Sequence, residues 1–321
     1  MKLVCGIDVS KDTLDLHYNL DSGREVSLRV KNNEKGHQKI VDVCGLRTCV
    51  MEASGPYYLR LAFFLKGAGC DVRVENPVRI KRFIQMGLER NKNDKKDARW
   101  LYRYGVERDA AVWQMPSEEA LKCSSITASI DLLTRQKTQL SNQIHSLDQL
   151  PGNHKELAKS LEKIRATLAK EVKALEQRLA AILKQWKGEQ VASVSSIPGL
   201  GKRAVALLIT ATNGFTKTEN HRQLIALTGL APREHQSGSS IKGKKGICKM
   251  GSGYLRNVLY MCSLSAIRHN KACKELYERL KAAGKKSKVA LIAVCNKLLK
   301  QAFAVATKGT KYQADFISKL A

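Results

Sequence analysis

The chain contains no C-x-x-C pair, although it has nine cysteines. Zinc frameworks are built on such closely spaced ligands, so the cysteine pattern argues against a structural zinc site. Prolines are also few, 6 in 321 residues, and 43% of the residues are hydrophobic. This composition favours ordered, helix-rich structure in two or three domains, with the cysteines as reduced and mostly buried thiols.

Long apolar segments are missing as well. No run of eighteen apolar residues occurs, so we expect nothing that spans a membrane. The first residues, M-K-L-V-C-G-I-D, are too short and too soon charged for a signal peptide. We therefore expect a cytoplasmic protein.

Acidic residues are scarce, since 29 Asp and Glu stand against 56 Lys and Arg, which gives a net charge of +27. The segment from His235 through Lys274 contains eight Lys or Arg and no acid, and the segment from Arg279 through Lys311 contains nine and no acid. The many positive charges repel one another, and binding of a polyanion relieves this repulsion. Nucleic acid is the first candidate for such a polyanion. A membrane surface is the weaker alternative, because no long basic amphipathic segment stands alone.

Residues 1–110 alternate between strand and helix patterns. Apolar or alternating runs predict strands at 3–9, 13–18, 25–30, 47–52 and 71–75, and helical spacing predicts helices at 35–43, 57–66, around 80–84 and at 94–104. Three strands followed by alternating helix and strand is the order of a ribonuclease-H-like α/β domain.

Carboxylates stand at the ends of two of these strands and at the start of the last helix. Asp8 ends the first strand, Glu52 ends the fourth, and Asp94 and Asp97 share one helix face because they are three residues apart. An acidic first turn favoured by the helix dipole is the simple explanation for Asp94 and Asp97. If all four converge, however, their repulsion calls for a cation, and such a group would form a phosphate-transfer site for Mg²⁺.

From about Ser117 to Trp186, apolar residues recur at spacings of three and four, with an interruption at Pro151-Gly152. This periodicity predicts long coiled-coil helices that act as a dimerising or spacer arm. A local helical core is the alternative interpretation.

Residues 188–321 have the pattern of a second, helical domain. The sequence P-G-L-G at 198–201 opens a helix and is similar to a helix-hairpin-helix element, whose backbone N–H groups suit a phosphate; an ordinary helix–helix turn is the alternative. The glycine- and serine-rich stretch after Leu230 is expected to be a mobile loop. Its serines and lysines could serve to contact a phosphate backbone, or one of the serines could supply a nucleophile. The residue types alone do not decide between these two interpretations.

Several motifs occur in a fixed order along the chain. They are G-I-D-V-S-K-D-T-L-D, E-A-S-G-P-Y, N-P-V-R-I-K-R-F, N-K-N-D-K-K-D-A-R, I-P-G-L-G, L-T-G-L-A-P-R and S-G-S-S-I-K-G. Together they resemble the DEDD transposases of bacterial insertion sequences, the family that is guided by a bridge RNA. The resemblance covers essentially the whole chain.

The resemblance implies a role for each motif. The acidic tetrad falls on Asp8, Glu52, Asp94 and Asp97, which would bind Mg²⁺ or Mn²⁺, and the nucleophilic serine falls on Ser237. It also implies a RuvC-like (ribonuclease H fold) catalytic domain at 1–110, coiled-coil dimerisation helices at 111–187 and a helical transposase domain at 188–321. The residues expected to contact nucleic acid are Lys92, Arg99, Gly199, Gly201, Lys202, Arg233, Lys242, Lys244 and Lys245.

The implied function is an RNA-guided DNA transposase or recombinase that exchanges strands between an insertion element and its target through a phosphoserine–DNA intermediate. Its expected partners are donor and target DNA, the guide RNA and further copies of itself in a homodimer or homotetramer, at the bacterial nucleoid. Two alternatives remain open: a metal-dependent nuclease similar to a Holliday-junction resolvase, without serine chemistry, and a nucleic-acid-binding protein without catalysis.

Overall fold

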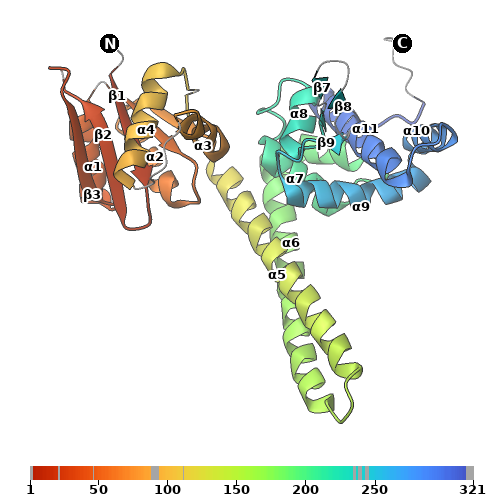
Figure 1. The fold of residues 1–321 in the computed structure, drawn as a ribbon. Coiled ribbons are helices and arrows are strands. Elements are labelled where there is room, and N and C mark those ends of the chain that lie inside the picture. Colours follow the sequence, from red (N-terminus) through yellow and green to blue (C-terminus); the bar gives the residue numbers. More distant parts are fainter. Residues whose placement is uncertain are drawn as a thin grey trace. The chain divides into compact units, whose positions relative to one another are not determined.

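The computed structural model describes residues 3–20, 22–45, 47–87, 94–110, 112–233, 236–237, 241–242 and 246–315. Contacts divide the chain into two compact units, Met1–Pro116 and Ser117–Ala321 (Figure 1). The long helices therefore belong to the C-terminal unit, and their separation as a domain of their own stays a prediction.

The N-terminal unit contains all the strands and helices that the sequence patterns predict for it. In chain order its elements are β1 (Val4–Val9), β2 (Thr13–Asn19), β3 (Glu25–Lys31), α1 (Glu34–Cys44), β4 (Thr48–Glu52), α2 (Tyr57–Gly67), β5 (Val72–Glu75), α3 (Pro77–Met86) and α4 (Asp94–Glu107). Asn33 and Asn76 cap the N-termini of α1 and α3 with their side-chain oxygens, which accept hydrogen bonds from first-turn N–H groups.

The described strands of this unit form a five-stranded sheet in the order β3-β2-β1-β4-β5. The strand β2 runs antiparallel to β1 and β3, as the predicted meander requires, whereas β4 runs parallel to β1 and β5. This mixed α/β arrangement is consistent with a ribonuclease-H-like domain.

The two faces of the sheet bury different residues, because successive side chains of a strand point to opposite sides. Cys5, Ile7 and Met51 belong to one core together with residues of α1 and α2 such as Ile40 and Leu61. A separate core on the other face joins Val4 and Val50 to apolar residues of α3 and α4.

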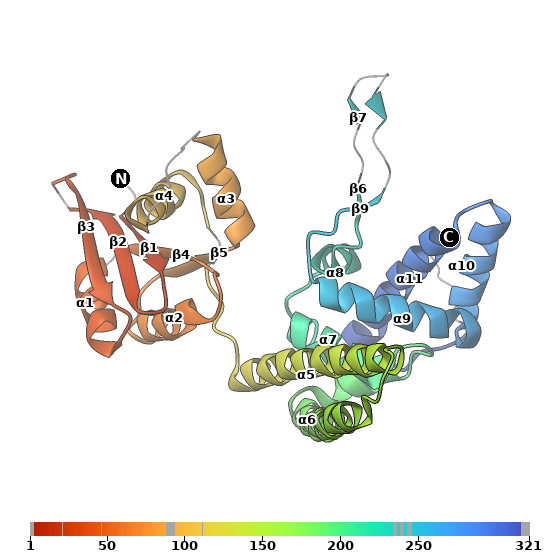
Figure 2. The same cartoon turned by 60° about the horizontal axis from the view of Figure 1, so that its bottom comes forward.

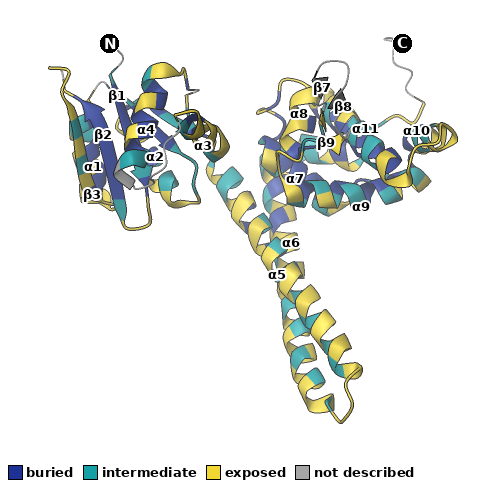
Figure 3. Ribbon diagram, viewed as in Figure 1, coloured by how far each residue is buried: buried dark blue, intermediate teal, exposed yellow. Residues whose placement is uncertain are grey.

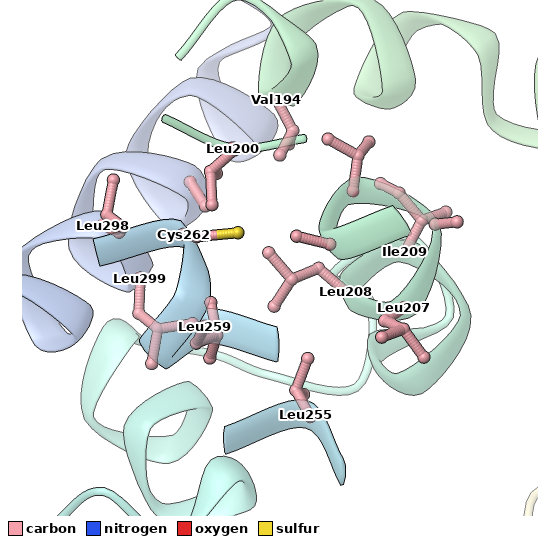
Figure 4. Close-up of a cluster of buried hydrophobic side chains, with 14 of the residues drawn as sticks. Val194, Leu200, Leu207, Leu208, Ile209, Leu255, Leu259, Cys262, Leu298 and Leu299 are labelled. Atoms are coloured by element: carbon pink, nitrogen blue, oxygen red, sulfur yellow. The ribbon is translucent and has the colours of Figure 1, made fainter. Parts of the chain in front are cut away.

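The C-terminal unit is mainly helical (Figure 1). Its elements are α5 (Glu118–Asp148), α6 (Lys155–Ser195), α7 (Lys202–Thr212), α8 (His221–Thr228), β6 (Pro232–Arg233), β7 (Gln236–Ser237), β8 (Ile241–Lys242), β9 (Gly246–Ile247), α9 (Gly253–His269), α10 (Lys271–Ala282) and α11 (Ser287–Lys308). The helices α6, α7, α9 and α11 share a core that includes Val194, Leu208, Leu259 and Leu298 (Figure 4).

The helices α5 and α6 are 31 and 41 residues long and pack side by side, joined at the predicted Pro151-Gly152 interruption. The helix α6 is kinked at Lys187, where φ is −141° and ψ is 43°. Away from the core of the unit the pair is largely exposed (Figure 3). The long helices are confirmed, whereas a coiled coil stays a prediction.

One helix among the described residues, α11, is long and apolar enough to cross a membrane. Its apolar side chains, among them Leu291, Val294 and Leu298, are buried in the core of the C-terminal unit. Core helices of soluble proteins have the same composition, so α11 is weak support for a membrane segment.

The nine cysteines all lie in the described residues, where none of them forms a disulfide bond. Eight are buried, and only Cys248 is partly exposed. The Sγ atoms of Cys44 and Cys49 are 3.0 Å apart, and hydrogen bonds from Cys49 and Cys5 lower the pKa of Cys44. The expectation of mostly buried thiols is confirmed, and their reduced state stays a prediction.

Asn270 connects several parts of the C-terminal unit and is only 1% exposed. Its Nδ2 atom donates to the Pro198 carbonyl oxygen (3.2 Å), and its Oδ1 atom accepts from the Tyr312 hydroxyl (3.0 Å) and from the Cys273 N–H at the start of α10 (3.3 Å). One side chain thereby joins the P-G-L-G turn, α10 and the C-terminal segment.

We expect Asn270→Ala to lower the free energy of unfolding of the C-terminal unit by about 2–4 kcal/mol, because it removes a helix cap and leaves buried polar groups unpaired. The matched control is Asn220→Ala, which removes an exposed cap from α8 and should cost about 1 kcal/mol. Urea unfolding monitored by circular dichroism measures both changes. Equal losses in the two variants would contradict a connecting role for Asn270.

Candidate functional site

The first two predicted carboxylates lie next to each other at the carboxyl ends of central strands. The parallel register pairs Gly6 with Val50 and Ile7 with Met51. The next residues along the two strands are Asp8 and Glu52, so their Cα atoms are neighbours at a strand spacing of about 5 Å. Both side chains are partly exposed, whereas the residues before them in each strand are buried.

The direction of α4 follows from two glycines that allow it to approach the sheet closely. A Cβ atom on Gly6 would lie 2.2 Å from the Tyr102 nitrogen and 2.3 Å from the Ala98 carbonyl oxygen. A Cβ atom on Gly105 would lie 2.7 Å from Val4 at the start of β1. The helix therefore runs antiparallel to β1, and its N-terminal turn lies at the strand end that carries Asp8.

This direction brings the helical aspartates toward the strand carboxylates. Gly6 contacts α4, and Val50 is its partner in β4. Asp8 and Glu52 lie two residues further along the same strands, so they share the α4 face of the sheet. Asp97 precedes Ala98 in the sheet-facing stripe of α4 and is partly exposed. Asp94 begins α4 one turn earlier, but its side chain lies outside the described residues.

Two further carboxylates, which the sequence patterns did not single out, extend this row across the sheet. Asp15 pairs with Asp8 across β1 and β2, and Glu75 pairs with Glu52 across β4 and β5. Both outer carboxylates are buried, at 5% exposure, and each has an arginine partner. The partners are Arg29, whose Nε lies 2.9 Å from Asp15, and Arg79, whose Nη1 lies 3.5 Å from Glu75.

The predicted nucleic-acid contact Arg99 takes part in an ion pair with Glu25 at the start of β3. Its Nη2 atom lies 3.2 Å from Glu25, and the same carboxylate lies 3.2 Å from His17. Burial lowers the pKa of His17, although its hydrogen bond to Glu25 raises it. The Arg99 side chain remains 60% exposed, so the ion pair leaves it accessible to a phosphate.

The donor chemistry of this corner fits a hard divalent cation, because carboxylate oxygens are the ligands that Mg²⁺ and Mn²⁺ prefer. Among the side chains that the structure describes, no three His, Cys, Asp or Glu residues are grouped so that they could hold a metal ion. The Asp94 side chain is not among them. Asp8, Glu52 and Asp97 are all described, so these three side chains alone do not form such a group. A metal site at this corner stays a prediction, supported by the register of β1 and β4 and by the direction of α4.

The predicted nucleophile lies in a segment that we call the arm, residues 230–248. Where a loop was expected, the described residues of the arm form two short antiparallel ladders, β6 with β9 and β7 with β8. Ser237 pairs with Ile241 in the outer ladder. Figure 2 shows β7 standing clear of the helices of its unit, beyond β6 and β9. The Ser237 backbone is thereby placed, whereas its side chain lies outside the described residues.

The P-G-L-G turn joins α6 to α7, as predicted, and its first glycine has a structural reason. Gly199 has a φ of +97°, and a Cβ atom there would lie 2.6–2.9 Å from Ala266 in α9. Gly201 precedes α7, and Lys202 begins it; both are exposed. These observations explain the turn as a packing element, and its contact with phosphate stays a prediction.

An open groove of about 930 Å³ runs beside this turn, between α5 and α9. Both glycines of the turn line it, together with Arg203. The Arg203 guanidinium is held in place, because its Nε donates to the Tyr254 hydroxyl at 2.8 Å and its Nη2 to the Thr134 hydroxyl at 3.3 Å. Arg203 is a phosphate-binding candidate that the sequence patterns missed.

The remaining predicted nucleic-acid contacts are basic residues of loops and of the arm. Arg233 is exposed in β6, and Lys242 lies in β8, where only its backbone is described. Lys92, Lys244 and Lys245 lie outside the described residues. Their roles stay predictions.

Comparisons with known proteins match both units. A family model described as "Transposase", of the DEDD IS110 type, matches residues 5–150, and one described as "Transposase IS116/IS110/IS902 family" matches residues 191–278. The pilin gene-inverting protein of Moraxella bovis is 24% identical over 95% of both chains.

Transposases of insertion sequences are similar along most of the chain as well. The transposase for IS1111A from Coxiella burnetii is 25% identical over 84% of this chain and 79% of its own, and the transposase for IS1328 from Yersinia enterocolitica is 23% identical over 96% and 97%. The chain therefore belongs to the IS110 family of transposases and is a DNA transposase or recombinase.

Proposed function

We propose that this transposase is an RNA-guided recombinase that exchanges DNA strands through a metal-binding acidic site and a covalent serine intermediate. The single observation that carries the proposal is the convergence of Asp8, Glu52 and the first turn of α4 at one corner of the sheet. Apolar contacts hold α4 on the sheet, and the placement of acidic residues at this shared corner supports the assignment of a cation site.

Asp8, Glu52, Asp94 and Asp97 would hold Mg²⁺ or Mn²⁺. When bound, such an ion polarises the scissile phosphate and stabilises the charge that develops on its oxygens. The outer pairs, Asp15 with Arg29 and Glu75 with Arg79, have their charges balanced internally and are not assigned as ligands.

Ser237 would supply the nucleophile. Its hydroxyl oxygen forms a bond to phosphorus as the bond from phosphorus to the 3′ oxygen breaks; the serine proton is released, and the leaving 3′ oxygen takes up a proton. The product is a phosphoserine-linked strand and a free 3′ hydroxyl. Attack by the 3′ hydroxyl of a partner strand then releases the serine and joins the exchanged strands.

The serine and the acidic site would come from different copies of the chain, so the working complex is a homodimer or homotetramer. The helices α5 and α6 support this assembly, because they expose the large apolar residues Leu132, Leu157 and Ile164. Exposed leucines on a pair of long helices are suited to packing against another copy.

Sequence choice would be delegated to base pairing with a guide RNA, while the protein contacts backbones. The net charge of +27 supports a complex that holds RNA as well as donor and target DNA. Exposed basic residues near the groove and in the arm, Lys202 and Arg233, provide contacts of this kind. The protein would act in the cytoplasm, at the nucleoid.

A covalent-trapping assay tests the proposal. Full-length protein, RNA transcribed from the flanks of the element, donor and target DNA and Mg²⁺ are mixed, denatured and separated on a gel. We expect a denaturation-resistant protein–DNA band that disappears in Ser237→Ala and without RNA. The matched control is Ser239→Ala, which alters a neighbouring serine of the same motif and should keep the band.

Each alternative function has its own signature in this assay. DNA cleavage without a covalent band, undiminished in Ser237→Ala, would replace the proposal with a metal-dependent junction nuclease. Binding without cleavage, unaffected by Mg²⁺, would leave a nucleic-acid-binding protein without catalysis. A covalent band that forms equally well without RNA would contradict the proposal that a guide RNA directs the reaction.

A further inference from the structure

The two backbone segments at the base of the arm cross in direct contact. Gly251 has a φ of +149°, and a Cβ atom there would lie 2.3 Å from the Leu227 carbonyl oxygen and 2.6 Å from the Gly229 nitrogen. The Lys249 N–H donates to the Gly229 carbonyl oxygen at 3.0 Å. The chain therefore leaves α8 and returns to α9 through one narrow crossing.

A single arginine of α9 binds both segments of this crossing. The Nη1 atom of Arg256 lies 2.9 Å from the carbonyl oxygen of Thr228, on the outgoing segment. The same atom lies 3.1 Å and 3.2 Å from the carbonyl oxygens of Gly251 and Lys249, on the returning segment. We call these three contacts the Arg256 clasp.

The clasp is attached to a rigid part of the unit. Arg256 lies in the first turn of α9, between the buried residues Leu255 and Leu259, and Ser252 caps this turn by accepting a hydrogen bond from the Leu255 N–H. Hydrogen bonds from a charged guanidinium to carbonyl oxygens are stronger than those between neutral groups. The base of the arm is thus fixed relative to the core of the C-terminal unit.

Among the described residues, backbone pairing extends this fixed base as far as the β6–β9 ladder. The Cys248 N–H donates to the Ala231 carbonyl oxygen at 2.8 Å, next to the β6–β9 ladder, and β7 with Ser237 follows six residues after Ala231. Ser237 follows this ladder in the chain, so we infer that a change in the direction of the ladder displaces Ser237 as well. Attack on phosphorus requires placement of the nucleophile within a fraction of an ångström.

We propose that Arg256 is a positioning residue for strand exchange, which acts by setting the direction of the arm that carries Ser237. Arg256 does not touch the reacting atoms in this assignment. The inference rests on the proposed serine chemistry, but the state of the clasp itself has a readout that is independent of activity.

The test compares full-length wild type with Arg256→Gln, Arg256→Lys and Arg268→Gln. The last variant is the matched control, because it removes the same charge from an exposed position at the other end of α9. Hydrogen–deuterium exchange at the amides of Cys248 and Lys249 reports the clasp, and the yield of covalent protein–DNA adduct reports positioning. Melting temperature and DNA affinity report the fold and the electrostatic contribution.

We expect Arg256→Gln to speed amide exchange at both positions and to lower adduct yield about tenfold or more. Its DNA affinity should fall no further than that of Arg268→Gln. Arg256→Lys keeps the charge and can still reach a carbonyl oxygen, so it should recover part of the yield and serves as the readout if Arg256→Gln does not fold.

Unchanged amide exchange in Arg256→Gln would show that the clasp does not hold the arm and would overturn the inference. So would faster exchange with undiminished adduct yield. If wild type recombines DNA without any adduct, the serine proposal falls; the positioning role is then overturned if Arg256→Gln also recombines at the wild-type rate.

Discussion

Asp8→Asn is expected to abolish DNA cleavage and strand exchange, with a loss of about a thousandfold or more, because the amide cannot replace the charged oxygen ligand of a divalent cation. Glu52→Gln should behave in the same way, since the register places Asp8 and Glu52 side by side. Both variants keep the size of the side chain, so the sheet should remain folded. Single-turnover cleavage in the presence of Mg²⁺ measures the loss.

The matched control is Asp12→Asn, which removes an exposed acid from the turn between β1 and β2. It should leave cleavage unchanged. Removal of divalent cations with a chelator should abolish wild-type cleavage, and Mn²⁺ should restore it. Calorimetric titration with Mn²⁺ gives a second readout, in which Asp8→Asn should lose the binding that wild type and Asp12→Asn retain.

Cleavage by Asp8→Asn within a few-fold of wild type would contradict the acidic site. DNA affinity in this variant should be equal or slightly higher, because a negative charge next to a polyanion has been removed. A large loss of affinity would indicate that the substitution disturbs the fold rather than the chemistry.

Gly6→Ala is expected to lower the free energy of unfolding of the N-terminal unit by about 3 kcal/mol or more and to abolish strand exchange. The added Cβ atom would lie 2.2 Å and 2.3 Å from backbone atoms of α4, which cannot move aside as a flexible side chain could. The helix must therefore shift off the sheet, and Asp97 moves away from Asp8 and Glu52.

The matched control is Gly67→Ala at the end of α2, where a Cβ atom meets nothing within 4 Å. This change should raise stability slightly, by about 0.5–1 kcal/mol, because alanine favours the helix. Urea unfolding and the strand-exchange assay measure both variants. Wild-type stability in Gly6→Ala would mean that α4 does not pack against β1 as described.

The strands and helices of the N-terminal unit could be predicted from sequence because their patterns are strong and local. The apolar run before Asp8 and the alternation in T-L-D-L-H-Y predicted β1 and β2, and helical spacing predicted α1 and α3. The long periodic stripes likewise predicted α5 and α6, with the break between them at Pro151-Gly152.

Contacts between distant segments left no comparable local signal. The direction of α4 depends on Gly6 and Gly105, and neither glycine differs in sequence from a turn residue. The buried Asp15 and Glu75 became visible only through strand register. The glycine-rich composition after Leu230 concealed two short ladders, because cross-strand pairing and not composition determines them.

The distribution of cysteines provides a spectroscopic handle that requires no engineering. Since Cys248 is the only partly exposed thiol among the nine, a maleimide dye added to the native protein should attach there first, one per chain. The label would sit at the returning end of the arm, where its anisotropy could report each encounter of the arm with RNA or DNA in real time.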